Sequence, residues 1–216
     1  MFSFAKKHYF PSNLAENIPL STPVDKLEFT VFDTETTGFN VARDDRLIEL
    51  GAVKIKNLQV IDNSAYQTYI NPNRQIPREI IELTSITQEQ TDEAPQALEA
   101  ITKLTNMANQ TSVCYVGHYL AFDMQAIQAE LKRNNLKWKN PKSLDTLDLI
   151  GYIAPSYDMR DLEKYARDFG TRIYQRHSAL GDALTTAYLF TELLQLSQDR
   201  GLKTWGDLLK IKGSQN

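Results

Sequence analysis

Strand-like stretches dominate the early part of the chain, and helical stretches dominate the later part. From Leu27 onward the side chains alternate as in a strand that ends near Gly38, and further strands are expected at about residues 47–55, 66–70 and 113–118. Helical spacing of apolar side chains predicts helices at about residues 79–83, 97–108, 121–134, 143–152, 160–169 and 179–197. Early strands at hairpin-like spacing, followed by alternating strands and helices, predict an α/β fold with a mixed central β-sheet flanked by helices.

The length of the chain favours one compact domain. With 216 residues, of which 42% are hydrophobic, the chain can bury one sizeable core. Prolines interrupt residues 1–25, where no clear periodicity is found, so we expect an irregular N-terminal arm there. The domain itself is expected over residues 26–200, and residues 201–216 are expected to form a tail or a short helix.

Charge and composition exclude several classes of protein. A net charge of −3 argues against a protein that coats nucleic acid nonspecifically, so any contact with nucleic acid has to be local. The densest basic stretch surrounds Trp138 and comprises Lys132, Arg133, Lys137, Lys139 and Lys142. This stretch either touches a phosphate backbone and stacks a base, or is a solvated surface whose cations favour the end of a helix.

The apolar stretches are too short to span a membrane, and no apolar run follows Lys6 and Lys7 near the start. Cys114 is the only cysteine, which excludes an internal disulfide and fits a reducing compartment. We therefore expect a cytoplasmic protein without a membrane segment.

Two acidic side chains extend the apolar face of the first strand. Asp33 and Glu35 share their parity with Val31, and residues of one parity lie on one face of a strand. An isolated Asp-x-Glu is more often a solvated turn after the strand has ended. Further acids elsewhere in the chain favour a functional interpretation.

Asp123 and Asp182 are these further acids. Asp123 follows a strand and begins a helix, where helix capping and the helix dipole also explain an acid. Asp182 shares a helical stripe with Thr186 and Leu189 beside an apolar row, so it faces the core. The dipole of its helix offers an alternative explanation for Asp182 as well.

His177 precedes Asp182 by five residues, which on an ideal helix would put the two side chains about 140° apart. The histidine should therefore lie off the helix. Ser178 is a plausible N-cap, which leaves His177 in the preceding loop, within reach of a site. An ordinary surface histidine is the alternative.

Four carboxylates that share one cleft would repel each other and become partly protonated. Mg²⁺ or Mn²⁺ prefers such oxygen ligands, and two ions roughly 3.5–4 Å apart can stabilise the attacking and leaving oxygens of a phosphodiester displacement. Zinc is not expected, because the chain has one cysteine and its histidines, His8, His118 and His177, are dispersed.

Three motifs occur in a fixed order along the chain. They are Phe32-Asp33-Thr34-Glu35-Thr36-Thr37-Gly38, then Gly117-His118 with Phe122-Asp123, then His177 with Asp182. Together they closely resemble the DEDDh exonucleases, which include the proofreading subunit of bacterial replicative DNA polymerase. The resemblance covers about residues 27–197.

The resemblance implies an RNase H-like exonuclease fold and hydrolysis of the last phosphodiester at a 3′ end, which releases a nucleoside 5′-monophosphate. It implies that Asp33, Glu35, Asp123 and Asp182 bind two divalent ions, Mg²⁺ or Mn²⁺, and that His177 is the general base. The substrate-binding residues that it implies are Thr36, Thr37, Gly38, Thr84 and His118. Asp145 is expected at a helix start and not as a ligand.

The sequence departs from the commonest family pattern at Tyr119, where Asn often follows the histidine, and at Ser85, where Gly is frequent. We expect a single-stranded 3′ end as substrate, with DNA favoured over RNA, in proofreading or repair beside a polymerase partner in trans. Two alternatives remain: an RNA-trimming enzyme of the ribonuclease T or oligoribonuclease kind, and a catalytically silent binding module.

Overall fold

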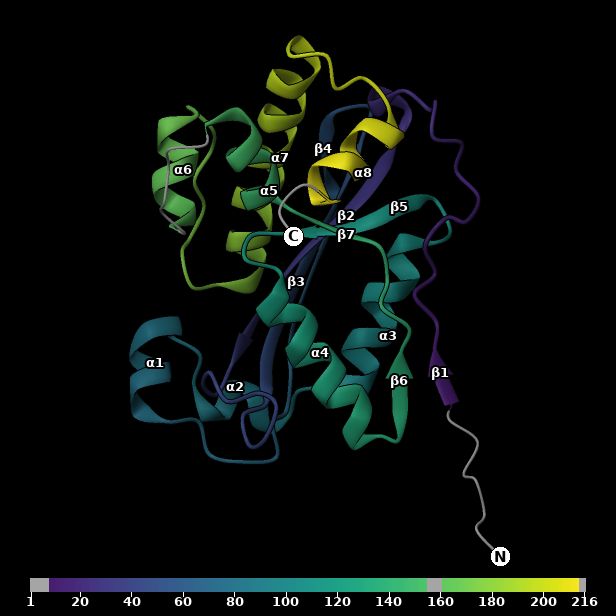
Figure 1. Cartoon of the computed structure of the whole chain (residues 1–216). Helices are drawn as coiled ribbons and strands as arrows, with labels where there is room; N and C mark the ends of the chain where they lie inside the picture. The colour runs from purple at the N-terminus through teal and green to yellow at the C-terminus, as the bar shows by residue number, and fades with distance from the viewer. Residues whose placement is uncertain (1–7, 155–160, 214–216) are drawn as a thin grey trace, which may run out of the picture.

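A computed structural model describes residues 8–154 and 161–213 of the chain (Figure 1). Three parts of the predictions lie outside the described residues. They are residues 1–7 of the predicted arm, the first residue of the helix predicted at 160–169, and residues 214–216 of the predicted tail.

A mixed sheet of five strands, in the order β4-β3-β2-β5-β7, forms the centre of the described structure. The strands are β2 (Glu28–Thr36), β3 (Leu47–Lys56), β4 (Gln59–Tyr69), β5 (Ser112–Gly117) and β7 (Ser143–Asp145). β2, β3 and β4 pair antiparallel, whereas β5 runs parallel to β2 and β7 runs parallel to β5. The predicted fold class is confirmed.

Helices cover both faces of this sheet (Figure 1). On one face lie α5 (Thr146–Ile153), α6 (Leu162–Asp168), α7 (Ala179–Asp199) and α8 (Trp205–Gly213). On the other face lie α3 (Ala97–Ala108) and α4 (Ala121–Arg133). The short helices α1 (Arg78–Thr84) and α2 (Gln88–Asp92) follow β4. No helix in the described part of the chain is long and apolar enough to cross a lipid bilayer.

The alternation along β2 assigns its side chains to two cores. Phe29 and Val31 are buried with residues of α7, and the ring of Phe29 contacts that of Phe190 edge to face at 5.1 Å. Phe32 is buried on the opposite face with residues of α3 and α4. Asp33 continues the parity of Phe29 and Val31, so the strand carries it on the α7 side of the sheet.

One glycine allows α7 to begin directly against the sheet. Gly51 in β3 lies opposite Asp33, and a Cβ atom on Gly51 would lie only 2.1 Å from the backbone nitrogen of Leu180. Only a residue without a side chain permits this approach. The first turn of α7, which carries Asp182, is therefore held close to β2 and β3.

Several short elements were not predicted. β1 (His8–Phe10), in the region of the predicted irregular arm, pairs parallel with β6 (Leu136–Trp138), and η1 (Val24–Lys26) is a single 3₁₀ turn before β2. β4 begins at Gln59, earlier than predicted, and the first residues of the helix predicted at 143–152 instead form β7. Elements of three residues carry too little periodicity to be found by pattern.

The stacking role considered for Trp138 is wrong. Its side chain is 1% exposed and its ring contacts that of Tyr115 at 5.4 Å, so no base can stack on it. Within the same basic stretch, Arg133 bonds to the Glu130 carboxylate and to backbone oxygens of the loop that follows β2. Arg133 therefore has a structural role.

Candidate active site

An acidic cavity lies at the C-terminal end of β2, between α4 and α7. Its volume is about 260 Å³. The acidic residues that line it are Asp33 and Glu35 from β2, Asp123 from α4 and Asp182 from α7. The structure thus brings together the four acids that the sequence singled out.

Asp123 is fixed to the backbone of β2. Its side chain is almost fully buried, and its Oδ1 accepts hydrogen bonds from the Thr34 backbone N–H at 2.9 Å and from the Thr34 hydroxyl at 2.6 Å. Because Thr34 lies between Asp33 and Glu35, these bonds connect the start of α4 to the acidic end of the strand.

Asp182 is held from the loop that precedes its own helix. Its Oδ1 forms an ion pair with the guanidinium of Arg176, and its Oδ2 accepts a hydrogen bond from the His177 backbone N–H at 3.3 Å. Arg176 lines the cavity as well. Arg176 was not predicted as a site residue, although its position next to His177 was a usable signal.

His177 lies in the loop before α7, as predicted, with a left-handed backbone (φ +58°). One of its ring nitrogens and carboxylate oxygens of Glu35 and Asp182 all lie within 4.8 Å of one another. The ring therefore reaches the acidic cluster although the residue is off the helix.

Ser178 is the N-cap residue of α7, as predicted, but its side chain makes no capping hydrogen bond. Glu49 takes that role instead: its Oε2 accepts a hydrogen bond from the Ala179 backbone N–H at 2.8 Å. The other oxygen of Glu49 accepts one from Gln67 Nε2 at 2.5 Å. Glu49 thus fixes the start of the helix that carries Asp182.

Glu49 was not predicted as a site residue, although the sequence contains a signal for it. It is the acid in the otherwise apolar stretch Leu47 to Val53 of β3, and it is 1% exposed. It also lies opposite Glu35 in the β2–β3 pairing, so a further carboxyl group lies beside Glu35.

Burial and mutual repulsion make the acids of the cavity hard to ionise. Burial, followed by the charges of Asp123, Asp182 and Glu35, raises the pKa of Asp33 well above its ordinary value. Burial and the neighbouring acids raise the pKa of Glu35 to about 8. Burial raises the pKa of Asp123 to about 7, although the bonds from Thr34 favour its charged form.

Burial also raises the pKa of Asp182, against the opposing effect of Arg176. One guanidinium does not balance four acids in one cavity. Carboxylate oxygens are the ligands that Mg²⁺ and Mn²⁺ prefer, so the donor set fits hard divalent cations.

The raised pKa values predict how the stability of the metal-free protein depends on pH. Glu35 and Asp123 have ordinary pKa values of 4.5 and 3.8 and folded-state values of about 8 and about 7. Between these limits the folded protein binds more protons than the unfolded chain, so the free energy of unfolding falls as pH rises. The melting temperature in EDTA should therefore decrease from about pH 5 to about pH 8.

Two comparisons test the origin of this slope. Mn²⁺ should flatten it, because a bound cation favours the ionised carboxylates. Glu35→Gln should reduce the slope in EDTA, whereas Glu82→Gln, at an exposed acid on α1, should leave it unchanged. An identical slope for Glu35→Gln and the wild type would show that the cavity acids do not cause it.

Of the residues expected to bind substrate, only His118 lines the cavity. One of its ring nitrogens lies 2.7 Å from the Thr146 hydroxyl. Thr36 and Thr37 bond within the turn after β2, to the Gly38 carbonyl and to Asp45. Thr84 is buried at the end of α1, where its hydroxyl bonds to the Ile80 carbonyl, and it does not line the cavity.

Aromatic side chains at the cavity were not anticipated as a group. Phe39, Tyr119 and Phe122 line it, and the Phe39 ring is 84% exposed. The rings of Phe39 and Phe122 lie 6.0 Å apart, centroid to centroid. The cavity therefore combines acidic and apolar walls.

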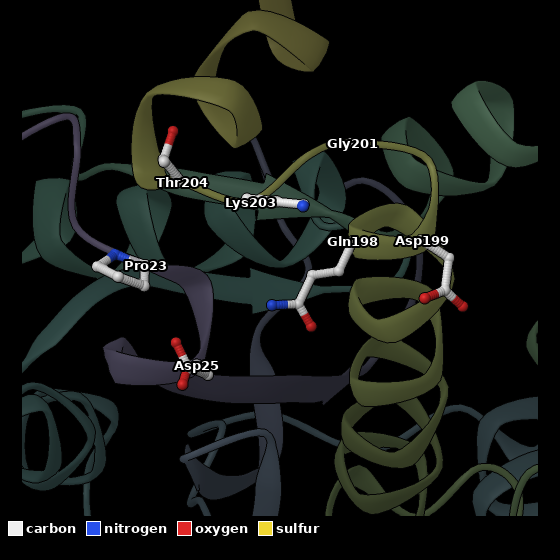
Figure 2. A pocket seen from close by; sticks show the side chains of 7 residues that line it. All are labelled: Pro23, Asp25, Gln198, Asp199, Gly201, Lys203 and Thr204. Atoms are coloured by element: carbon white, nitrogen blue, oxygen red, sulfur yellow. The ribbon is translucent and has the colours of Figure 1, made fainter.

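A second hollow lies beyond the opposite end of β2, with a volume of about 750 Å³ (Figure 2). Asp25 comes from η1, and Asp199 from the end of α7. Lys203 shares the hollow, so its charges are mixed. In sheets of this kind ligands bind beyond the carboxyl ends of the strands, which favours the acidic cavity as the site.

Comparison with known proteins identifies the family. The profile of an exonuclease family, RNase_T, matches residues 30–190. The chain belongs to this exonuclease family. The match does not test the predicted domain boundaries at residues 26 and 200, which stay predictions.

Two relatives are similar in sequence. The DNA polymerase III PolC-type protein of Bacillus subtilis (strain 168) is 30% identical over 229 residues, which covers 100% of this chain and 16% of that protein. The DNA polymerase III subunit epsilon-like protein of Rhodobacter capsulatus is 32% identical over 196 residues, covering 90% of this chain and 27% of that protein. The chain thus spans only a small part of each relative.

Solved structures share the fold. Exonuclease X, in complex with 5′ overhanging duplex DNA, superposes with a TM-score of 0.66 and 18% identity, covering 85% of this chain and 98% of that one. The nuclease domain of 3′hExo, a DEDDh family member bound to rAMP, gives 0.69 and 19%, covering 81% and 94%. The predicted resemblance to an exonuclease family and the predicted α/β fold are confirmed, and the direction of hydrolysis belongs to the proposed function.

Proposed function

We propose that this exonuclease removes nucleotides one at a time from the 3′ end of a DNA strand, by hydrolysis that releases nucleoside 5′-monophosphates. The observation that carries the proposal is the convergence of four acids with raised pKa values on one cavity, beside a histidine. A cavity with this charge needs cations before a phosphodiester can approach it.

The residues that would hold two divalent ions are Asp33, Glu35, Asp123 and Asp182. When bound, such ions stabilise negative charge on the attacking and leaving oxygens of a phosphodiester displacement. The protein orients these ligands through Thr34, which fixes Asp123, and through the loop before α7, which fixes Asp182.

His177 is the proposed general base, which takes the proton from the attacking water. Its position off the helix leaves the ring near Glu35 and Asp182. A neutral imidazole ring can accept this proton. Proposed contacts to the terminal nucleotide come from His118 and from the turn formed by Thr36, Thr37 and Gly38, and Thr84 stays a proposed contact of the terminal base.

The preference for DNA is proposed from the relatives, which are named for DNA polymerase III. By the same reasoning we propose a polymerase partner in trans, a role in proofreading or repair, and a cytoplasmic location. The buried thiol of Cys114 is consistent with a reducing compartment.

RNA is the second candidate substrate. A 3′-exonuclease described in 3′-end specific recognition of a histone mRNA stem-loop has the same fold, with a TM-score of 0.63 and 20% identity. The same acids and histidine would serve either polymer, so the choice depends on contacts to the sugar.

The test uses 5′-labelled DNA and RNA oligonucleotides, single-stranded and with a 3′ mismatch, in Mg²⁺ or Mn²⁺. DNA should shorten in a ladder of single nucleotides, faster than RNA, and a bulky group on its 3′-hydroxyl should stop the reaction. Asp199→Asn, in the second hollow, is the matched control and should behave as the wild type. Short oligomers released from the 5′ end would refute the proposal, and faster RNA shortening would make the enzyme an exoribonuclease.

A further inference from the structure

Tyr119 has an unfavourable backbone conformation. Its φ is +57°, in the left-handed region that bulky side chains rarely adopt. Most other non-glycine residues with positive φ in the described chain are asparagines, and Tyr119 carries the largest side chain among them. Such strain persists only where the surrounding structure enforces it, and it is found preferentially at functional sites.

A single carboxylate enforces this conformation. Asp145, the N-cap of α5, accepts hydrogen bonds from the backbone N–H groups of Tyr119 at 3.1 Å, Leu120 at 2.7 Å and Leu147 at 3.0 Å. Asp145 also pairs with Gly117 across β5 and β7. The turn that carries Tyr119 is thereby tied to two strands and a helix start.

The side chain of Tyr119 is not used for packing the core. It is 47% exposed and lines the acidic cavity together with Phe122 and Phe39. An asparagine would fit the left-handed turn better and would leave the core intact. The chain therefore keeps an aromatic ring at the cavity in spite of the backbone strain.

We propose that Tyr119 is a binding residue for the substrate, whose ring stacks on a nucleobase near the 3′ end. Every base has an aromatic face, so such a contact holds a strand without selecting its sequence. An uncharged ring also suits this cavity. The surrounding acids repel the phosphate and offer no aromatic face to the base, so the ring supplies the contact that they cannot. The inference rests on the proposed function and adds the contact that holds the base.

The variant Tyr119→Asn separates strain from binding. Asparagine tolerates the left-handed backbone, so the melting temperature should rise. Loss of the stacking surface should raise KM for a single-stranded oligonucleotide by about 5- to 50-fold, with a smaller change in kcat. Tyr119→Phe should retain both the KM and the melting temperature of the wild type.

Substrates without bases test the stacking itself. An oligonucleotide with abasic 3′-terminal nucleotides should raise KM for the wild type, and Tyr119→Asn should add nothing further on this substrate. Tyr119→Leu keeps the strain and the apolar bulk but lacks the aromatic face, so its KM should rise without a gain in melting temperature. Tyr9→Asn, at an exposed tyrosine on β1, is the matched control and should change neither quantity.

A lower melting temperature and an unchanged KM for Tyr119→Asn would make the ring structural and overturn the inference. An equal rise of KM on normal and abasic substrates would exclude stacking and overturn it as well. Failure of the proposed function is distinguishable, because the wild type itself would then not shorten any labelled strand.

Discussion

Asp182→Ala and Asp33→Ala should each reduce turnover by roughly 10³-fold or more. Each variant removes a proposed ligand of a cation that would stabilise the charge developing in the transition state by several kcal/mol. Every 1.36 kcal/mol lost corresponds to about a tenfold lower rate. The measurement is single-turnover cleavage of a 5′-labelled oligonucleotide. EDTA should have the same effect on the wild type, and Mg²⁺ or Mn²⁺ should restore the rate.

A stability measurement shows whether this loss is chemical. Burial and repulsion by the other acids raise the pKa of Asp33, so Asp33→Asn should keep or increase the melting temperature of the metal-free protein. An inactive variant of undiminished stability has lost its chemistry and not its fold. Full wild-type activity in excess chelator would refute the metal-dependent mechanism.

His177→Asn should lose turnover by about 10²- to 10⁴-fold, which is the usual cost of removing a general base. Asparagine is the preferred substitution because the residue has φ +58°, which an alanine would occupy with strain. The variant should therefore keep its thermal stability and its affinity for Mn²⁺, measured calorimetrically without substrate. A loss of stability without a matching loss of rate would indicate a structural histidine.

The pH dependence of the rate completes this test. In the wild type, the rate should fall as the pH is lowered, because a protonated ring cannot accept the proton of the water. The residual activity of His177→Asn should lack this acidic limb. The same pH profile in both proteins would assign the proton transfer to another group.

The chemistry of the site could be predicted because periodicity reports the direction of side chains. The parity of β2 predicted that Asp33 and Glu35 continue an apolar face, and the helical stripe predicted that Asp182 faces the core. All three side chains line the cavity. Parity and stripe depend only on local backbone geometry, which a sequence specifies well.

What could not be predicted depends on contacts between distant parts of the chain. Glu49 is 130 residues from the Ala179 amide that it caps, and no local pattern connects the two. The backbone strain of Tyr119, in the turn after β5, depends on Asp145 at the end of β7. The short strands β1 and β6 exist only because they pair with each other, so neither has a periodicity of its own.

Asp182 is held both by the guanidinium of Arg176 and by the backbone N–H of His177, and these two contacts link metal binding to the loop before α7. A divalent ion bound as proposed would have to compete with Arg176 for this carboxylate, and the loop that carries Arg176 also carries His177. Metal occupancy and the position of the proposed base are therefore linked through one short segment. When divalent ions are scarce, the guanidinium of Arg176 offsets part of the repulsion between the cavity acids. The metal-free enzyme would then stay folded but inactive until ions bind again.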